Sequence, residues 1–192
     1  NTLWCLYSNT KMLFAVACWI LVDKGHLSFD SYICDYIDTF SGNNKDKVTL
    51  KHLLIHSGGF PKSPEPTIDI WHDSQKRKEF VSNIQLEYKP GSKIFYHRLS
   101  AHWVLAVLIE TITGQDFKRA INELVIEPLG LSNDLYLPVP KEQHNRCAFV
   151  YQTQTQRLPV IDKNNSNPTW WESAYPAAGA YGTARGCCAL YQ

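Results

Sequence analysis

The sequence pattern predicts a mostly helical fold with a few short strands, and three observations lead to that prediction. Residues 12–22 form an unbroken apolar run, which indicates a buried helix. Between residues 99 and 112 the apolar side chains recur at helical spacing. After Gly130 the chain is rich in Asn, Gln, Pro and Thr with only short apolar pieces, a texture typical of loops that join brief strands.

The elements follow one another with recognisable start and stop signals. Gly25, Gly114 and Pro128 end three of the helices, because glycine suits a helix C-terminus and proline cannot continue a helix. Thr49 is a capping residue for a short helix that ends before a Gly-Gly pair. In order, we predict an extended segment over 3–7, helices over 12–22, 50–56, 74–86, 99–112 and 117–126, short strands within 148–151 and 158–161, and the opening turns of a helix over 183–192.

The charge balance and the apolar runs exclude several classes of protein. The chain has 192 residues with 19 Lys or Arg and 18 Asp or Glu, a formal charge of +1, so neither a nucleic acid nor an acidic surface is an expected partner. The basic cluster 76–78 lies between Asp73 and Glu79 and is read as a solvated helix face. The apolar run 12–22 is shorter than the roughly 18 residues that a membrane span needs.

The chain is expected to be one partial domain that is truncated at both ends. It begins with Asn1 rather than Met, and its last residues look like a helix that is cut off. No internal repeat divides residues 1–192; residues 8–131 are predicted to be mostly helical, and residues 132–192 to hold loops, short strands and the start of a helix. A targeting signal can be lost with missing ends, so the cellular compartment stays open, as does the oligomeric state. The six cysteines show no metal-ligand spacing and are read as buried free thiols rather than disulfides.

Ser8 and Lys11 form the first candidate for chemistry. The two residues lie three positions apart at the start of a predicted helix, so their side chains share one face. A serine hydroxyl becomes a good nucleophile when a base takes its proton, and a lysine can be that base if burial lowers its pKa. The apolar helix that follows can supply the burial. The alternative is a capping serine beside a solvated lysine, because an S-x-x-K match alone is a weak signal.

Five segments in one order make the sequence resemble a known family. They are Tyr7-Ser8-Asn9-Thr10-Lys11, Leu53-Leu54-Ile55-His56-Ser57-Gly58-Gly59, Pro90-Gly91-Ser92-Lys93-Ile94-Phe95-Tyr96, Glu127-Pro128-Leu129-Gly130-Leu131 and Gly179-Ala180-Tyr181-Gly182-Thr183-Ala184-Arg185. In this order they resemble the serine β-lactamase-like hydrolases, a family that includes class C β-lactamases, penicillin-binding carboxypeptidases and esterases. The resemblance implies an α/β (α+β) fold, with a helical lobe joined to part of an antiparallel-sheet domain and the nucleophile at their junction.

The resemblance also implies roles for individual residues. Ser8 corresponds to the acyl-forming nucleophile, Lys11 shares its proton, and Tyr96 acts as the base and then protonates the leaving group. The family pattern Tyr-x-Asn is replaced here by Tyr96-His97-Arg98, and the following helix starts one residue later than usual. Arg98 lacks the acceptor of an amide but can bind a substrate carboxylate, so Arg98 and His97 are the expected substrate-binding residues. An alternative is that Tyr96 is only a packed aromatic residue and that His97 or His102 is the base.

One family motif is absent from this stretch of sequence. No Lys-Thr-Gly or His-x-Gly tripeptide follows Arg185, although the resemblance implies that a strand with this motif supplies one oxyanion donor beside the Ser8 N–H. Removing one such donor typically lowers the rate by about 10²–10³. We therefore expect the chain of residues 1–192 to be inactive by itself.

These observations favour a serine hydrolase with an acyl-enzyme mechanism and a small-molecule or peptide substrate. Because Arg98 replaces the asparagine, an esterase or a peptidase is a better prediction than a true β-lactamase. The alternative is a catalytically silent relative that serves as a binding or scaffold protein. His52 and His56 could be two metal ligands, but the H-E-x-x-H pattern and a third ligand are lacking, so no metal or other cofactor is expected. The aromatic residues Trp170, Trp171 and Tyr175 are candidates for lining the substrate cleft.

Overall fold

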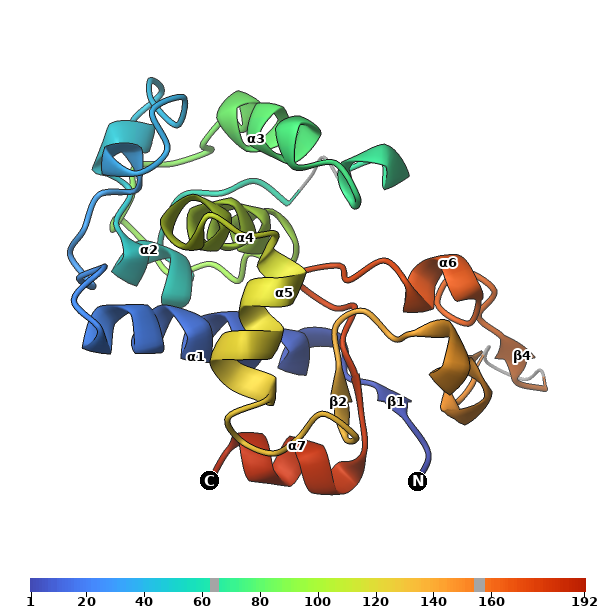
Figure 1. The fold of residues 1–192 in the computed structure, drawn as a ribbon. Coiled ribbons are helices and arrows are strands. Elements are labelled where there is room, and N and C mark those ends of the chain that lie inside the picture. Colours follow the sequence, from blue (N-terminus) through green and yellow to red (C-terminus); the bar gives the residue numbers. More distant parts are fainter. Residues whose placement is uncertain (63–65, 154–157) are drawn as a thin grey trace.

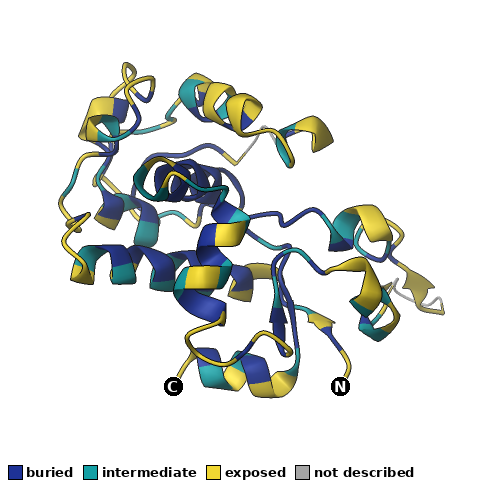
Figure 2. Cartoon of the chain, viewed as in Figure 1, coloured by how far each residue is buried: buried dark blue, intermediate teal, exposed yellow. Residues whose placement is uncertain are grey.

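A deeply buried helix, α4 (Ser100–Thr113), is the centre of a helical lobe. The computed structural model describes residues 1–62, 66–153 and 158–192, and in it α4 packs against four neighbouring helices (Figure 1). These neighbours are α1 (Thr10–Asp23), α2 (Leu50–Leu54), α3 (Ser74–Asn83) and α5 (Phe117–Ile121). Every residue from Ser100 to Glu110 is buried, which the continuous dark blue of α4 in Figure 2 shows. A helix that is buried on all sides needs apolar residues all round, and residues 103–109 of α4 are all apolar.

Short strands close the other side of the molecule. A three-stranded antiparallel sheet has the order β1–β5–β2, formed by Trp4–Cys5, Tyr181–Gly182 and Leu135–Tyr136. The central strand β5 pairs Gly182 with Trp4 on one side and with Leu135 on the other. A separate hairpin pairs β3 (Tyr151–Gln152) with β4 (Val160–Ile161), and the short helices α6 (Pro168–Trp171) and α7 (Ala184–Leu190) flank β5 in the sequence. The sheet therefore joins the first residues of the chain to the last ones, as the meeting of blue and red ribbons in Figure 1 shows.

Most of the predicted helices are confirmed, with small shifts of their ends. The Thr49 cap is present: its side chain accepts the His52 N–H, and the His52 side chain accepts the Thr49 N–H. The helix predicted over 74–86 is shorter, because the chain turns extended at Ile84. The helix predicted over 117–126 is present, but its second half, Asn122–Ile126, is wound as a π-helix. The strand predicted within 158–161 is β4, and the one predicted within 148–151 overlaps β3 at Tyr151 only, whereas β2 and β5 were not predicted from the sequence.

Two sequence predictions concern the state of the cysteines and the length of the apolar helices. All six cysteines are free thiols, but only Cys18 and Cys147 are buried, so the expectation of uniformly buried thiols is wrong. Cys188 is exposed and the other three are partly buried. Within residues 1–62, 66–153 and 158–192, no helix is long and apolar enough to cross a bilayer.

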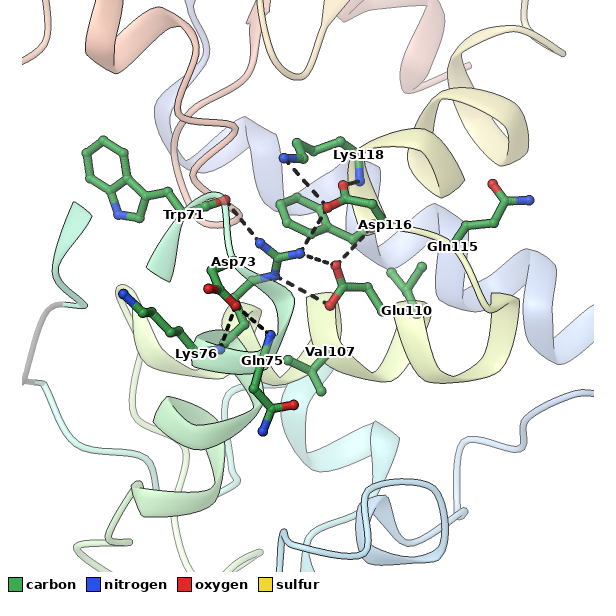
Figure 3. Close-up of polar contacts among 12 residues, drawn as sticks. Trp71, Asp73, Gln75, Lys76, Val107, Glu110, Gln115, Asp116 and Lys118 are labelled. Atoms are coloured by element: carbon green, nitrogen blue, oxygen red, sulfur yellow. Dashed lines mark hydrogen bonds and ion pairs between the residues drawn. The ribbon is translucent and has the colours of Figure 1, made fainter. Parts of the chain in front are cut away.

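A buried ion network connects the three helices α3, α4 and α5 (Figure 3). Arg77 of α3 is fully buried, and its guanidinium donates hydrogen bonds to both carboxylate oxygens of Glu110 in α4. The same guanidinium pairs with Asp116, 2.9 Å away, at the N-terminus of α5. It also donates to the main-chain oxygen of Trp71 over 3.1 Å. Arg77 thus fixes both the helix packing and the position of the Trp71 segment.

Candidate active site

Ser8 lies in a tight turn between β1 and α1. It belongs to a one-turn 3₁₀ helix, Tyr7–Asn9, and its side chain is exposed. The preceding residue, Tyr7, has φ of 43°, a left-handed conformation that a non-glycine residue adopts only when its surroundings hold it there. Ala180 provides part of that hold, because its main-chain oxygen accepts the Leu6 N–H and its N–H donates to Thr10 Oγ1, over 2.9 and 3.0 Å. The turn that presents Ser8 is therefore fastened on both sides.

Lys11 lies one helical turn beyond Ser8 and points back to it. Its Nζ donates hydrogen bonds to Ser8 Oγ over 3.2 Å and to the main-chain oxygen of Ala177 over 2.8 Å. Burial lowers the pKa of Lys11 from its ordinary value, and the charge of Arg98 adds to this effect, although Tyr96 acts in the opposite direction. A lysine with a lowered pKa loses its proton nearer to neutral pH and can then accept one from Ser8.

The hydroxyl of Tyr96 completes the contact around Ser8. The Tyr96 oxygen lies 2.6 Å from Ser8 Oγ, and Lys11 Nζ lies 5.3 Å from the centre of the Tyr96 ring. Burial raises the pKa of the Tyr96 phenol, but hydrogen bonds from Ser8 and Lys11 and the charges of Lys11 and Arg98 outweigh burial, so the pKa is lowered from 10. The structure thus brings together the three residues that the sequence analysis named as catalytic.

A strained turn after α2 supports the segment that carries Tyr96. The main-chain oxygens of Ser57 and Gly59 accept the N–H groups of Gly91 and Glu87, each over 2.8 Å. Gly59 has φ of 86°, and a Cβ at this position would lie well inside van der Waals contact with the main-chain oxygen of Tyr88. Only glycine allows the two segments to approach this closely.

Replacing Gly59 with alanine is expected to destabilise the protein by more than left-handed strain alone. That strain costs about 1–2 kcal/mol for a residue with a Cβ. Gly42→Ala is a matched control, because Gly42 has φ of 72° and open space around its Cβ position. Urea unfolding of the two variants measures the difference in the free energy of unfolding. Equal losses would contradict the close approach of Gly59 to Tyr88.

A cavity of about 880 Å³ opens beside Ser8. One wall is aromatic: Trp71, Trp170 and Tyr175 pack on one another with ring centres 5.7 to 6.0 Å apart. Arg98 lies on the same cavity, and it is exposed. The other lining residues are Tyr7, Pro66, Ile68, Leu99, Asn164, Asn165, Asn167, Thr169, Ala177 and Ala178. The cavity is large enough for a drug-sized ligand, and its described lining residues offer apolar surface, amide groups and the guanidinium of Arg98.

Comparisons with known proteins fit this geometry. The family model described as Beta-lactamase matches residues 1–192. The chain belongs to the beta-lactamase family. Among curated proteins, a putative D-alanyl-D-alanine carboxypeptidase of Escherichia coli (strain K12) is 34% identical over 154 residues, which cover 73% of this chain and 35% of the relative. A protein with the same description from Salmonella agona (strain SL483) is 31% identical over the same shares.

Solved structures of the beta-lactamase family show the same fold. A penicillin-binding protein homologue from Caulobacter crescentus superposes with a TM-score of 0.80 at 26% identity, covering 98% of this chain and 54% of the other. A family VIII carboxylesterase superposes with a TM-score of 0.83 at 23% identity, covering 99% of this chain and 55% of the other. The chain therefore has a partial serine β-lactamase-like fold, which confirms the predicted fold class. It spans about a third of the length of the curated relatives and about half of the solved structures.

His97 lies away from the cavity of this beta-lactamase-family chain. Its side chain is 1% exposed, and its Nε2 hydrogen-bonds with the Tyr88 hydroxyl over 3.0 Å. The exposure of the side chains alternates along this segment: Tyr96 and Arg98 are exposed, whereas His97 is buried. His102 is also buried, on α4. Arg98 therefore lines the cavity, as predicted for a substrate-binding residue, but His97 does not. Neither His97 nor His102, the two alternative bases, lines the cavity.

The remaining candidates from the sequence are also located. His52 caps α2 through its Nδ1, and His56 Nδ1 accepts a main-chain N–H from His97, so each imidazole has a hydrogen-bonding partner. In the described part of the chain, no group of three or more His, Cys, Asp or Glu side chains is placed to hold a metal ion. Trp170 lines the cavity, whereas Trp171 is buried in a separate cluster with Leu3 and Tyr181.

Two participants in this beta-lactamase-family site were missed in the sequence. The main-chain oxygen of Ala177 holds Lys11 across 166 positions of sequence, and a main-chain acceptor has no residue-type signal. Trp71 reaches the cavity because Arg77 holds its main chain, which depends on the packing of α3 against α4. The nearest available signal was the segment 179–185, which begins two residues after Ala177 and carried part of the resemblance.

Proposed function

We propose that this chain is the nucleophile-bearing part of a serine hydrolase that forms an acyl-enzyme on an ester or amide substrate. The observation that carries the proposal is that Ser8 Oγ lies within hydrogen-bond reach of both the Lys11 ammonium and the Tyr96 hydroxyl, at 3.2 and 2.6 Å. A nucleophile and a base in contact, with the base held by a third group, are the recurring arrangement of nucleophilic catalysis. Family membership and the described carboxypeptidase and carboxylesterase relatives support the same reaction class.

The proposed reaction has two steps that use the same groups. Tyr96, as phenolate or through Lys11, accepts the proton of Ser8 while Ser8 Oγ attacks the substrate carbonyl carbon. The tetrahedral intermediate collapses to a Ser8 ester, and the proton passes to the departing alcohol or amine. Water then attacks the ester carbonyl with proton removal by the same base, which releases the acid and restores Ser8.

The cavity lining favours an ester or peptide substrate over a β-lactam. The wall of Trp71, Trp170 and Tyr175 offers apolar surface for an acyl group beside Ser8. Arg98 supplies a positive charge for a carboxylate but not the amide acceptor that the Tyr-x-Asn pattern provides. We therefore propose an esterase or peptidase with a small-molecule or peptide substrate that carries a carboxylate.

Covalent labelling of Ser8 tests this proposal. An activated serine oxygen attacks the phosphorus of a fluorophosphonate and displaces fluoride, so the full-length protein is expected to gain one phosphonyl group, mapped to Ser8 by peptide mass spectrometry. Ser8→Ala should remain unlabelled, whereas Ser92→Ala, at an exposed serine in a surface turn, should be labelled like the wild type. A folded protein with an unlabelled Ser8 would contradict the proposal and favour the catalytically silent binding or scaffold protein.

The chain of residues 1–192 alone is expected not to turn over esters. It contains no Lys-Thr-Gly or His-x-Gly tripeptide after Arg185, so the second oxyanion donor that the family resemblance implies is not supplied. The lack of one donor lowers the rate by about 10²–10³. Hydrolysis of p-nitrophenyl butyrate by the purified chain, compared with Ser8→Ala, measures this. Steady Ser8-dependent turnover would contradict the prediction.

A further inference from the structure

His56 contacts the chain on both sides of Tyr96. Its main-chain oxygen accepts the N–H of Phe95 over 2.9 Å, and its Nδ1 accepts the N–H of His97 over 3.2 Å. Its ring also meets the Tyr96 ring edge-on, with the ring centres 4.7 Å apart. Three contacts from one residue therefore bracket the tyrosine whose hydroxyl touches Ser8.

The side-chain contact requires a neutral imidazole. Nδ1 can accept the His97 N–H only when it carries no proton, so the proton of neutral His56 is on Nε2. In the protonated form both ring nitrogens are donors, and two N–H groups would then oppose each other. The hydrogen bond to His97 is thus made only by the uncharged form of His56.

The groups around His56 keep it uncharged. Burial lowers the pKa of His56, and the nearby charge of Lys11 lowers it further. The His97 and His102 rings lie 5.5 and 6.1 Å from the His56 ring, measured between ring centres. Burial, with a smaller contribution from His56, lowers the pKa of His97 to about 4. The pKa of His102 is far below its ordinary value because of burial and then Lys11. Lys11 of α1, His97, His102 of α4 and Tyr96 itself face His56, and of these four only Tyr96, as the phenolate of the proposed reaction, can carry a negative charge.

We propose that His56 is a positioning residue, which holds the main chain on both sides of Tyr96 so that the phenol hydroxyl stays on Ser8. The inference rests on the proposed function, because that function makes Ser8 the nucleophile. No hydrogen bond joins His56 to Ser8 in the described part of the chain, so His56 acts through Tyr96. The left-handed φ of 58° at His56 is part of this arrangement, since it turns the chain so that oxygen and ring meet the same segment.

Two substitutions separate the acceptor from the backbone conformation. His56→Gly accepts the left-handed φ but removes the acceptor, whereas His56→Asn tolerates the same φ and offers an amide oxygen in place of Nδ1. His52→Ala is the matched control, because His52 Nδ1 also accepts a main-chain N–H, from Thr49, and in the described part of the chain His52 makes no hydrogen bond or ring contact with Tyr96. Urea unfolding of each variant defines the conditions under which all are fully folded.

The first readout is phosphonylation of Ser8 in the full-length protein by a fluorophosphonate, with the saturation constant and the limiting rate determined separately. His56→Gly is expected to lower the limiting rate about 10²-fold with little change in the saturation constant, because misplacement by about 1 Å has an effect of this size. His56→Asn should recover most of the rate, and His52→Ala should leave it unchanged. Equal rates in His56→Gly and wild type, or equal losses in His56→Gly and His52→Ala, would overturn the proposal.

The second readout does not depend on activity. The ultraviolet absorbance of tyrosinate, taken as the difference between each protein and its Tyr96→Phe variant, reports the pKa of Tyr96 alone. In wild type this pKa is lowered by the contacts with Ser8 and Lys11. In His56→Gly it is expected to return toward 10, and in His56→Asn to stay low. An unlabelled Ser8 together with this shift would refute the proposed function and support the positioning role; an unshifted Tyr96 would refute the positioning role whatever Ser8 does.

Discussion

Acylation of Ser8 is expected to slow by about 10²–10⁴-fold when Lys11 is replaced with methionine, the range found for a positioned acid or base. Methionine keeps the length of the side chain but cannot donate to Ser8 Oγ or to the Ala177 oxygen, as Lys11 does over 3.2 and 2.8 Å. It also removes the cation that lowers the pKa of Tyr96, so the phenol should lose its proton only at higher pH.

The Lys11→Met prediction also specifies how the acylation rate changes with pH. Lys11 is active as a base when it is deprotonated, so the acylation rate of the wild type should rise with pH through a lowered Lys11 pKa. In Lys11→Met that rise should disappear or move to the higher pKa of Tyr96. Lys24→Met, at an exposed lysine just after α1, is the control and should keep the wild-type profile. An unchanged rate and profile in Lys11→Met would exclude Lys11 from the proton transfer.

The free energy of unfolding is expected to fall by about 3–5 kcal/mol when Arg77 is replaced with methionine. The guanidinium is fully buried and neutralises Glu110, whose side chain is also almost completely buried. Removing one partner of a buried ion pair leaves the other charge without compensation, which is why the expected loss is large. The first effect on the site should be at Trp71, whose main-chain oxygen loses its donor. Urea unfolding measures the first effect, and the difference in tryptophan fluorescence between each protein and its Trp71→Phe variant measures the second.

Two further variants test whether the uncompensated charge of Glu110 causes the loss of stability. Arg119→Met removes an arginine that pairs with Glu123 on the surface, and it should change the free energy of unfolding little because water screens exposed pairs. The double variant Arg77→Met with Glu110→Met should be more stable than Arg77→Met alone, because apolar replacement of both partners removes the stranded charge. A double variant less stable than Arg77→Met would mean that Glu110 contributes mainly through the Phe117 N–H that it accepts.

The parts of the fold that local pattern determines were predictable. The apolar run 12–22 and the spacing over 99–112 place α1 and α4 within two residues at each end. The strands β2 and β5 were not predicted, although they have two residues each, as β3 and β4 do. Their pairing depends on contacts between distant segments, which a single sequence does not display.

In the candidate site, too, some contacts could be predicted from the sequence and others could not. Ser8 and Lys11 are three positions apart, so helical geometry alone predicts their contact. Tyr96 lies 88 positions from Ser8, and only the resemblance to a family pointed to it. Along residues 96–98 the side chains point alternately outward and inward. Hydrogen bonds of His97 with His56 and Tyr88 determine that His97 is the one that points inward. The sequence contains no signal for that choice.

The fastening of the Ser8 turn by residues near the other end of the chain has a consequence for folding. The contacts of Lys11 with Ala177 and of Thr10 with Ala180 span 166 and 170 positions. Closing a loop of that length has a large entropic cost, which is met only after most of the intervening chain has collapsed. A chain still emerging from the ribosome, or one cut before residue 177, therefore carries a Lys11 without its carbonyl partner. Under the proposed function, the contacts that activate Ser8 are therefore completed late, and an unfinished molecule presents Ser8 as an ordinary hydroxyl.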